Sequence, residues 1–485
     1  MFKFINNKHL PFWLTAISFF IALIVPTLIK DGMFMDGMLY TCVSKNLANG
    51  LGSFWFPNFS KTIMPSFHEH PPLVFGIQSL FFSILGNSLY VERFYSFLTA
   101  CITGFLIILM WKQVFDTETE LKKLSWLPFF YWIIFPLTFW SFSNNMQENT
   151  MGIFTLSSAY LIIKGLKTNR HTVIYLIFSG ILIFLGTLCK GFPGLFPLVI
   201  VGLYWIIYKN TSFRRMIIYT LILILVPMIS YSVLLLDSEI FESLSRYLFN
   251  RAINRIQTAH TVDNRFFIVQ RLFMELLPAI LVSLVLVITY KYKSFNFRKI
   301  KTYKKSIILF LLIGVSGSFP LMLTMVQKGF YMVHSFPFYA IGMAIIVAPG
   351  LAELIKRINT KKLSFKIYKV ISISLLISTI IFSALQIGKA GRDENTLHDV
   401  YLIGEVVPEG STIGIDPSIK SEWSLYCYFS RYFYISLKHS YSEAEYFMTH
   451  KTFDTNISNK YRKIPLATRK YDLYHVDSKS EKTEN

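Results

Sequence analysis

Asp36 is a carboxylate at the start of a predicted short helix. It opens the run Asp36-Gly-Met-Leu-Tyr40, and a glycine at position 50 predicts the end of that helix. The carboxylate has two roles that the spacing leaves open. It is either an N-cap that accepts the amides of the first turn, or a base that takes a proton from an acceptor.

Three ionisable side chains stand together in the run Phe67-His-Glu-His-Pro-Pro72. Histidine nitrogens and carboxylate oxygens are ligands that zinc prefers in proteins, so Glu69 with a histidine predicts a metal site if further ligands come from elsewhere. The same residues also fit a solvated loop. The spacing alone favours the solvated loop.

Arginines recur in the segment 245–260, at positions 246, 251 and 255. Planar guanidinium groups bind phosphate oxygens in pairs, which predicts a phosphate clamp. Attraction to anionic lipid headgroups explains the same residues equally well.

Three more charged residues lie beside apolar runs. Glu148 opens an apolar segment, as a helix-capping acid or a functional one. Lys190 and Lys328 each precede a glycine, which we interpret as room for the backbone to approach a bulky anionic ligand.

The composition indicates the class of protein that positions these residues. Of the 485 residues, 53% are hydrophobic and only 16% are charged, whereas soluble domains carry about 25% charged residues. The net charge of +20 would suit nucleic acid, but the basic residues fall in short tracts between apolar runs. That distribution is typical of membrane topology and argues against a nucleic-acid partner.

About eleven apolar runs are long enough to be transmembrane helices. Lysine and arginine gather in alternate loops, which predicts a cytoplasmic N-terminus. The segments 30–89 and 237–271 and the tail from residue 388 then lie outside. The predicted spans are 10–29, 90–111, 125–141, 148–165, 173–188, 193–208, 216–236, 272–290, 306–325, 331–349 and 368–386.

The predicted fold is therefore an all-α polytopic membrane domain over residues 1–386 and a small extracytoplasmic α/β domain over residues 387–485. The first outside loop should hold two surface helices, near 39–47 and 71–86, the first with its polar side facing water. In the tail, 411–415 and 446–449 read as strands and 423–437 as a helix, with disorder after residue 477.

The order of these motifs resembles the GT-C superfamily of polyprenyl-phosphate-dependent glycosyltransferases, in the branch of bacterial aminoarabinose transferases and protein mannosyltransferases. The resemblance covers roughly residues 10–350. It rests on the Asp36 helix, Glu69 before the double proline, Glu92-Arg93, the acid Glu148, Lys190-Gly191, and Lys328-Gly-Phe-Tyr331.

The resemblance implies roles for individual residues. Asp36 matches a base or acceptor-positioning aspartate, with Glu148 as a second catalytic acid. Glu69 matches an acid that binds a divalent metal, zinc, together with a later histidine, for which His260 is the candidate. Residues that match contacts to the lipid phosphate are Lys190, Arg251, Arg255, Lys328, Tyr331 and His70, which replaces the lysine of the family motif.

The implied reaction moves a sugar from a polyprenyl-phosphate donor to an envelope lipid, glycan or protein, with inversion, on the periplasmic face of the bacterial inner membrane. Two other classes remain open from the sequence. One is a polytopic lipid or sugar transporter, which predicts charges near the midplane of the membrane. The other is a non-catalytic partner in envelope glycan assembly, in which Asp36 would be dispensable.

Overall fold

The computed structural model describes residues 7–292, 298–439, 444–452, 457 and 460–477. Within them the chain forms two compact units. The first comprises the N-terminal residues to Leu28, Glu69–Leu73 and Ser96–Ile387, and the second comprises Ile29–His68, Val74–Tyr95 and the residues from Gly388. The predicted disorder after residue 477 lies outside the described residues. The domain division at residue 386 stays a prediction.

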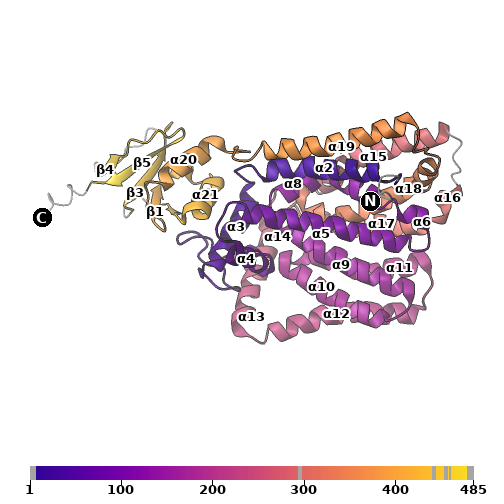
Figure 1. Ribbon diagram of the computed structural model, residues 1–485. Coiled ribbons are helices and arrows are strands. Elements are labelled where there is room, and N and C mark those ends of the chain that lie inside the picture. The colour runs from indigo at the N-terminus through magenta and orange to yellow at the C-terminus, as the bar shows by residue number, and fades with distance from the viewer. Residues whose placement is uncertain (1–6, 293–297, 440–443, 453–456, 458–459, 478–485) are drawn as a thin grey trace. The chain divides into compact units, whose positions relative to one another are not determined.

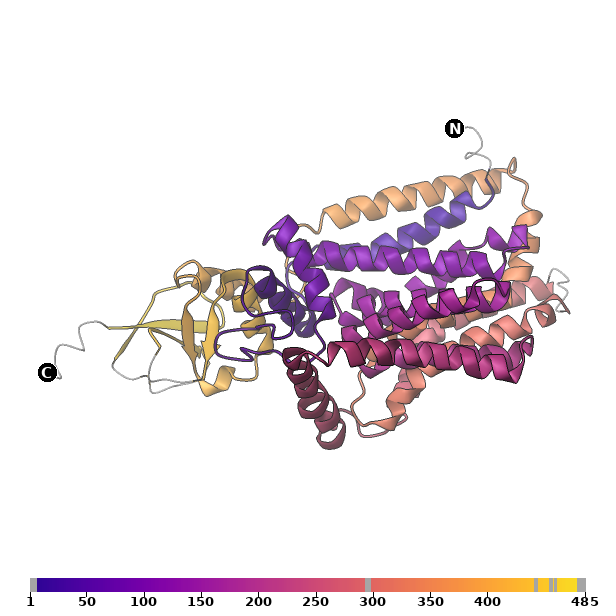
Figure 2. The same ribbon diagram turned by 90° about the horizontal axis from the view of Figure 1, so that it is seen from below.

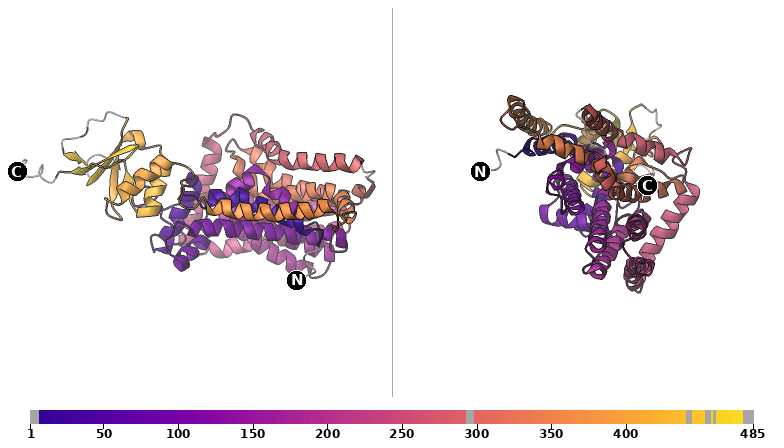
Figure 3. Two further views of the ribbon diagram at one scale, coloured as in Figure 1. Left: turned by 45° about the horizontal axis from the view of Figure 1, so that its top comes forward. Right: turned by 90° about the vertical axis from the view of Figure 1, so that its right-hand side faces the viewer.

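The first unit is a bundle of helices that run side by side, as Figure 2 shows and as the end-on view of Figure 3 shows again. Neighbours along the chain pack closely, as α9 does with α10, and distant segments also meet, as α2 does with α19. The helices are α2 (Leu10–Leu28), α5 (Val91–Val114), α6 (Thr119–Lys122), α7 (Trp126–Ile133), α8 (Pro136–Ser143), α9 (Gln147–Thr168), α10 (Thr172–Lys190), α11 (Ile200–Tyr208), α12 (Phe213–Leu234), α13 (Ser238–Ser245), α14 (Asn254–Thr258), α15 (Phe267–Tyr292), α16 (Arg298–Thr302), α17 (Lys304–Ser318), α18 (Phe336–Lys356) and α19 (Leu363–Ala384).

Several of these helices are extended or interrupted by irregular turns. Three are 3-10 segments, η1 (Phe192–Val199), η3 (Phe319–Leu323) and η4 (Gly329–Ser335), and η2 (Arg246–Ile253) is π-helical. Pro193, Pro197 and Pro320 lie in the 3-10 segments, where a missing amide prevents regular α-helical bonding. Helix α7 meets α8 at a bend of 77°.

Each predicted span falls on one helix or on two consecutive helices. Among the described residues, eight helices are long and apolar enough to cross a membrane, and a ninth results if the bent pair is one span. The polytopic all-α architecture is thus confirmed, while the number of eleven stays a prediction. Helix α9 is not among these helices, and its first turn carries Gln147, Glu148 and Asn149, all buried.

The second unit contains a five-stranded sheet with the order β2-β1-β3-β5-β4 (Figure 1). Strand β1 pairs in parallel with β2 and β3, and the other pairs are antiparallel. A small α/β arrangement is therefore confirmed. The strands are β1 (Thr412–Ile415), β2 (Ser436–Lys438), β3 (Tyr446–His450), β4 (Tyr461–Lys463) and β5 (Tyr471–Val476), with helices α20 (Glu394–Gly404) and α21 (Trp423–Phe433) and the short turn η5 (Pro417–Ile419).

Two further helices of this unit come from the first predicted outside loop, α3 (Met35–Ala48) and α4 (Leu73–Leu85). The expectation that α3 turns its polar side to water is wrong. Lys45 and Asn46 are buried, because the Lys45 ammonium donates to the carbonyl of Arg431 and the Asn46 amide donates to the carbonyls of Asn58 and Phe59. Helix α3 is a core element that packs on α21.

Candidate active site

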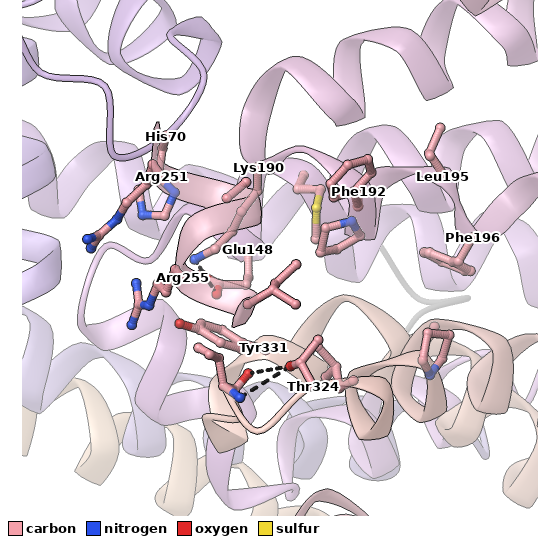
Figure 4. Close-up of a pocket in the computed structure, with 18 of the residues that line it drawn as sticks. His70, Glu148, Lys190, Phe192, Leu195, Phe196, Arg251, Arg255, Thr324 and Tyr331 are labelled. Atoms are coloured by element: carbon pink, nitrogen blue, oxygen red, sulfur yellow. Dashed lines mark hydrogen bonds and ion pairs between the residues drawn. The ribbon is translucent and has the colours of Figure 1, made fainter. Parts of the chain in front are cut away.

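The first unit contains an open cavity of about 440 Å³. Charged side chains gather at one part of its lining and apolar side chains form the rest, as Figure 4 shows. The first part holds the charged residues Glu69, Glu148, Lys190, Arg251 and Arg255, together with His70. The apolar part includes Met151, Phe192, Leu195, Phe196, Val199, Ile256, Pro320, Leu321 and Val326.

Lys190 and Glu148 form a buried ion pair in this cavity. The Lys190 ammonium lies 2.5 Å from a Glu148 carboxylate oxygen, and the two side chains are only 8% and 1% exposed. Helix α9 begins at Gln147, so Glu148 sits in the first turn, where the helix dipole favours a negative charge. Helix α10 ends at Lys190 because Gly191 has a positive φ of 74°. The pair fixes the lysine at the cavity wall.

Two arginines reach the same cavity from the segment 238–258. Arg251, in η2, forms an ion pair with Glu69, and Arg255, in α14, has no ion pair among the described residues. His70 lies beside them (Figure 4). Burial and then the charges of Lys190, Arg251 and Arg255 hold the pKa of His70 well below its usual value, so its imidazole is neutral.

Tyr247 joins this segment to the end of α10. Its hydroxyl donates to the carbonyl of Lys190 at 3.4 Å, and a Cβ at Gly191 would lie 2.2 Å from that hydroxyl. The interpretation that Gly191 leaves room for a ligand is therefore wrong, because Tyr247 occupies the space. Gly329 is likewise enclosed by Leu137 and Arg271.

Tyr331 completes the polar part of the cavity. It lies in η4, and the Lys190 ammonium is 5.1 Å from the centre of its ring. Seven residues that the sequence analysis singled out thus meet in one cavity. They are Glu69, His70, Glu148, Lys190, Arg251, Arg255 and Tyr331.

Three other candidates are not part of this lining. Asp36 belongs to the second unit, where it sits in the first turn of α3. The cap residue of that helix is Phe34, so Asp36 is not its N-cap. Lys328 and His260 belong to the first unit, but both are exposed and neither lines the cavity. Their roles stay predictions.

The predicted zinc site is not supported. The carboxylate of Glu69 is engaged by Arg251, and no group of three His, Cys, Asp or Glu side chains suited to a metal occurs in the described parts of the chain. An arginine beside Glu69 disfavours a cation there.

The apolar wall of the cavity was not predicted from the sequence. Phe192 and Phe196 lie on η1, and Val199 ends that segment. The available signal was the run Gly191-Phe-Pro-Gly-Leu-Phe-Pro197, whose two prolines within a predicted span indicate irregular backbone. Irregular backbone at membrane depth is tolerated where it lines a cavity.

Part of the chain is similar to a known protein family. Residues 69–234 match the family model described as dolichyl-phosphate-mannose-protein mannosyltransferase. No curated protein matches the chain.

The fold is similar to that of solved structures over nearly the whole chain. One is ArnT from Cupriavidus metallidurans bound to undecaprenyl phosphate, with a TM-score of 0.59 and 10% identity over 96% of this chain and 97% of that one. The apo state of the same enzyme also has a TM-score of 0.59 and 10% identity, over 94% and 95%. The apo oligosaccharyltransferase from Archaeoglobus fulgidus has a TM-score of 0.50 and 12% identity, over 86% of this chain and 60% of that one.

The resemblance inferred from the order of motifs is thus confirmed by the likeness of fold to ArnT and by the family model that matches residues 69–234. The chain is a multi-pass membrane protein whose fold is similar to that of ArnT.

Proposed function

We propose that this protein is a membrane glycosyltransferase whose donor is a sugar linked to polyprenyl phosphate. One observation carries the proposal, namely that a single cavity combines three cations, two of them paired with carboxylates, with an extended apolar wall. A lipid phosphate has matching parts, an anion for Lys190, Arg251 and Arg255 and a hydrocarbon chain for the apolar wall. Charge-assisted hydrogen bonds of this kind contribute about 1.5–3 kcal/mol each.

The charges also suit the chemistry of transfer. In the reaction the bond between the anomeric carbon and the phosphate oxygen breaks, and its electron pair stays on the lipid phosphate. Lys190, Arg251 and Arg255 stabilise the charge that develops there. Because Glu148 holds Lys190 in place, we assign Glu148 a positioning role in this step.

The acceptor reacts through a hydroxyl oxygen, which forms the new bond to the anomeric carbon. We propose that Asp36 takes the hydroxyl proton as base. Attack from the side opposite the leaving phosphate inverts the configuration at that carbon. The proposed acceptor is an envelope lipid, glycan or protein on the outer face of a bacterial inner membrane, in agreement with the lysine distribution.

Binding of undecaprenyl phosphate to the detergent-purified protein tests the donor site. Wild type should bind, and Lys190→Gln or Arg255→Gln should weaken the affinity about tenfold, since 1.4 kcal/mol corresponds to a factor of ten. Arg246→Gln is the matched control, because Arg246 is on the same segment but pairs with Glu242 and does not line the cavity. Equal losses in all three variants would argue for non-specific attraction of the lipid.

A further inference from the structure

The stretch that leads into Asp36 is held by residues from the other end of the chain, within the second unit. Asp31 forms a bridge with Ala390, in which the amide of Asp31 donates to the carbonyl of Lys389 at 2.9 Å and the amide of Gly391 donates to the carbonyl of Asp31 at 2.7 Å. This bridge holds the backbone of Asp31, four residues before helix α3 begins at Met35.

The side chain of Asp31 is held as firmly as its backbone. Tyr432 donates to one carboxylate oxygen at 2.6 Å, and Tyr401 donates to the other, also at 2.6 Å. Arg93 approaches the first oxygen at 3.7 Å. Hydrogen bonds to an ionised carboxylate are among the stronger ones in proteins.

The same stretch is contacted again closer to Asp36. The Tyr428 hydroxyl donates to Asp393 at 2.9 Å and lies 3.4 Å from the carbonyl of Met33, and the Cys427 thiol lies 3.7 Å from the carbonyl of Met35. Cys427, Tyr428 and Tyr432 lie on one helix, α21. Contacts from α21 therefore reach the residue directly before Asp36.

A buried charge network fixes α21 in turn. Arg431 is 1% exposed, and its guanidinium lies 2.8 Å from Glu92, which also pairs with Arg93 at 2.7 Å. The guanidinium further donates to the carbonyls of Asn87 and Ser88. Breaking one contact of such a network would leave a buried charge unpaired, which is strongly destabilising. The network therefore holds α21 in one arrangement.

We propose that α20 and α21 of the C-terminal segment form a positioning element for Asp36. Tyr401, Tyr428 and Tyr432 are its positioning residues, and they act through the stretch Asp31–Met35. A base must lie within hydrogen-bond reach of the proton that it takes, so small displacements of this stretch slow transfer. The inference rests on the proposed function, because it assumes that Asp36 serves as base. It assigns the C-terminal segment to the acceptor side of the reaction.

The test compares tyrosine variants in the full-length protein. Tyr432→Phe and Tyr401→Phe each remove one hydroxyl from Asp31 and keep the ring, and Tyr428→Phe is a third variant with a different partner. The matched control is Tyr426→Phe, on the same helix α21, whose hydroxyl contacts the Lys420 carbonyl and His439 instead. For each variant, kcat and donor KM of transfer are measured, together with undecaprenyl phosphate affinity and Tm.

The positioning role predicts a fall in kcat of about tenfold for Tyr432→Phe, with unchanged donor KM and lipid affinity. Tm should fall by a few degrees, because a hydrogen bond to a charged group is lost. Tyr426→Phe should behave as wild type. In the Asp36→Asn background the tyrosine variants should cause no further loss of the residual transfer, because residues that act through one another are not additive.

Three results would overturn the inference. They are an unchanged kcat in all three variants, a parallel loss in the control, or a full additional loss in the Asp36→Asn background. Wild type that binds no lipid phosphate and transfers no sugar would remove the proposed function, and this inference with it. Wild type that binds and transfers, combined with any of the three results, would remove only the inference.

Discussion

At the scale of residues, the cavity depends on charges that neutralise one another in pairs. Lys190 pairs with Glu148 and Arg251 pairs with Glu69, so Arg255 adds the charge that remains. All five residues could be predicted from the sequence. Their pairing could not, because it depends on the rotation of α9 against α10 and on the course of the segment 238–258.

Replacing Glu148 tests the pairing with Lys190. Glu148→Gln leaves the lysine with an uncompensated buried charge and frees its side chain to move, so we expect kcat/KM to fall about tenfold or more and stability to fall as well. The double variant Glu148→Gln with Lys190→Met should recover stability but not activity. Thermal unfolding measures the stability of each variant, and transfer rates measure its activity. If the effects of the two substitutions on stability simply add in the double variant, the pairing is contradicted.

Lys45 provides a pH-dependent test of the second unit. Burial, followed by the charge of Arg431, lowers the pKa of Lys45 from 10.5 to about 7. Above pH 7 the folded protein has a neutral amine while the unfolded chain stays protonated up to about pH 10.5. The unfolded state therefore binds more protons, and stability should rise with pH from about 7.

Lys45→Met should remove this rise, because it keeps an apolar stem without a titratable group. Unfolding of wild type and variant in the same detergent at about pH 6.5 and about pH 9.5 should show a larger advantage for the variant at the lower pH, of a few degrees in Tm. A difference between the two proteins that does not change with pH would show that Lys45 is charged throughout.

At the scale of elements, irregular helices build the cavity. The 3-10 segments η1, η3 and η4 and the π-helical η2 all contribute to its lining. Sequence periodicity predicts helices well but not such irregular turns, so the spans could be predicted while the apolar wall could not. The buried side of α3 was mispredicted for a related reason, since Lys45 and Asn46 find partners far away along the chain.

Gly191 tests how α10 is joined to the segment 238–258. Gly191→Ala places a side chain at a φ of 74° and against the Tyr247 hydroxyl. We expect the segment to be displaced and undecaprenyl phosphate to bind about tenfold more weakly. Combination with Tyr247→Phe should restore part of the affinity, because the hydroxyl is the nearest atom. If the double variant recovers no affinity, the contact with Tyr247 is not the cause, and the loss of lipid affinity comes from backbone strain at Gly191 alone.

At the scale of the whole molecule, the sequence predicted the class of protein, the order of the helices and the α/β character of the tail. It did not predict that residues 29–68 and 74–95 form one compact unit with the residues from Gly388. Contacts such as Arg431 with Glu92 join residues 339 positions apart, and no local pattern indicates them.

The orientation of the chain in the membrane is predicted from the distribution of lysine and arginine over its loops. In a variant without its four native cysteines, single cysteines at Ser53 and Glu409 should react with an impermeant maleimide in intact spheroplasts. A cysteine at Asn169, in a predicted inside loop, is the control and should react only after permeabilisation. The reverse labelling pattern would invert the topology.

The central claim is sugar transfer from a lipid phosphate, and mass spectrometry of the cell envelope tests it most directly. Lipids, glycans and proteins are compared among cells that lack the gene and cells that carry wild type or Asp36→Asn. One sugar-sized mass increment should be lost on deletion and restored by wild type alone, while polyprenyl-phosphate-linked sugar should accumulate in the other two strains. Identical envelope spectra in all three strains would contradict it.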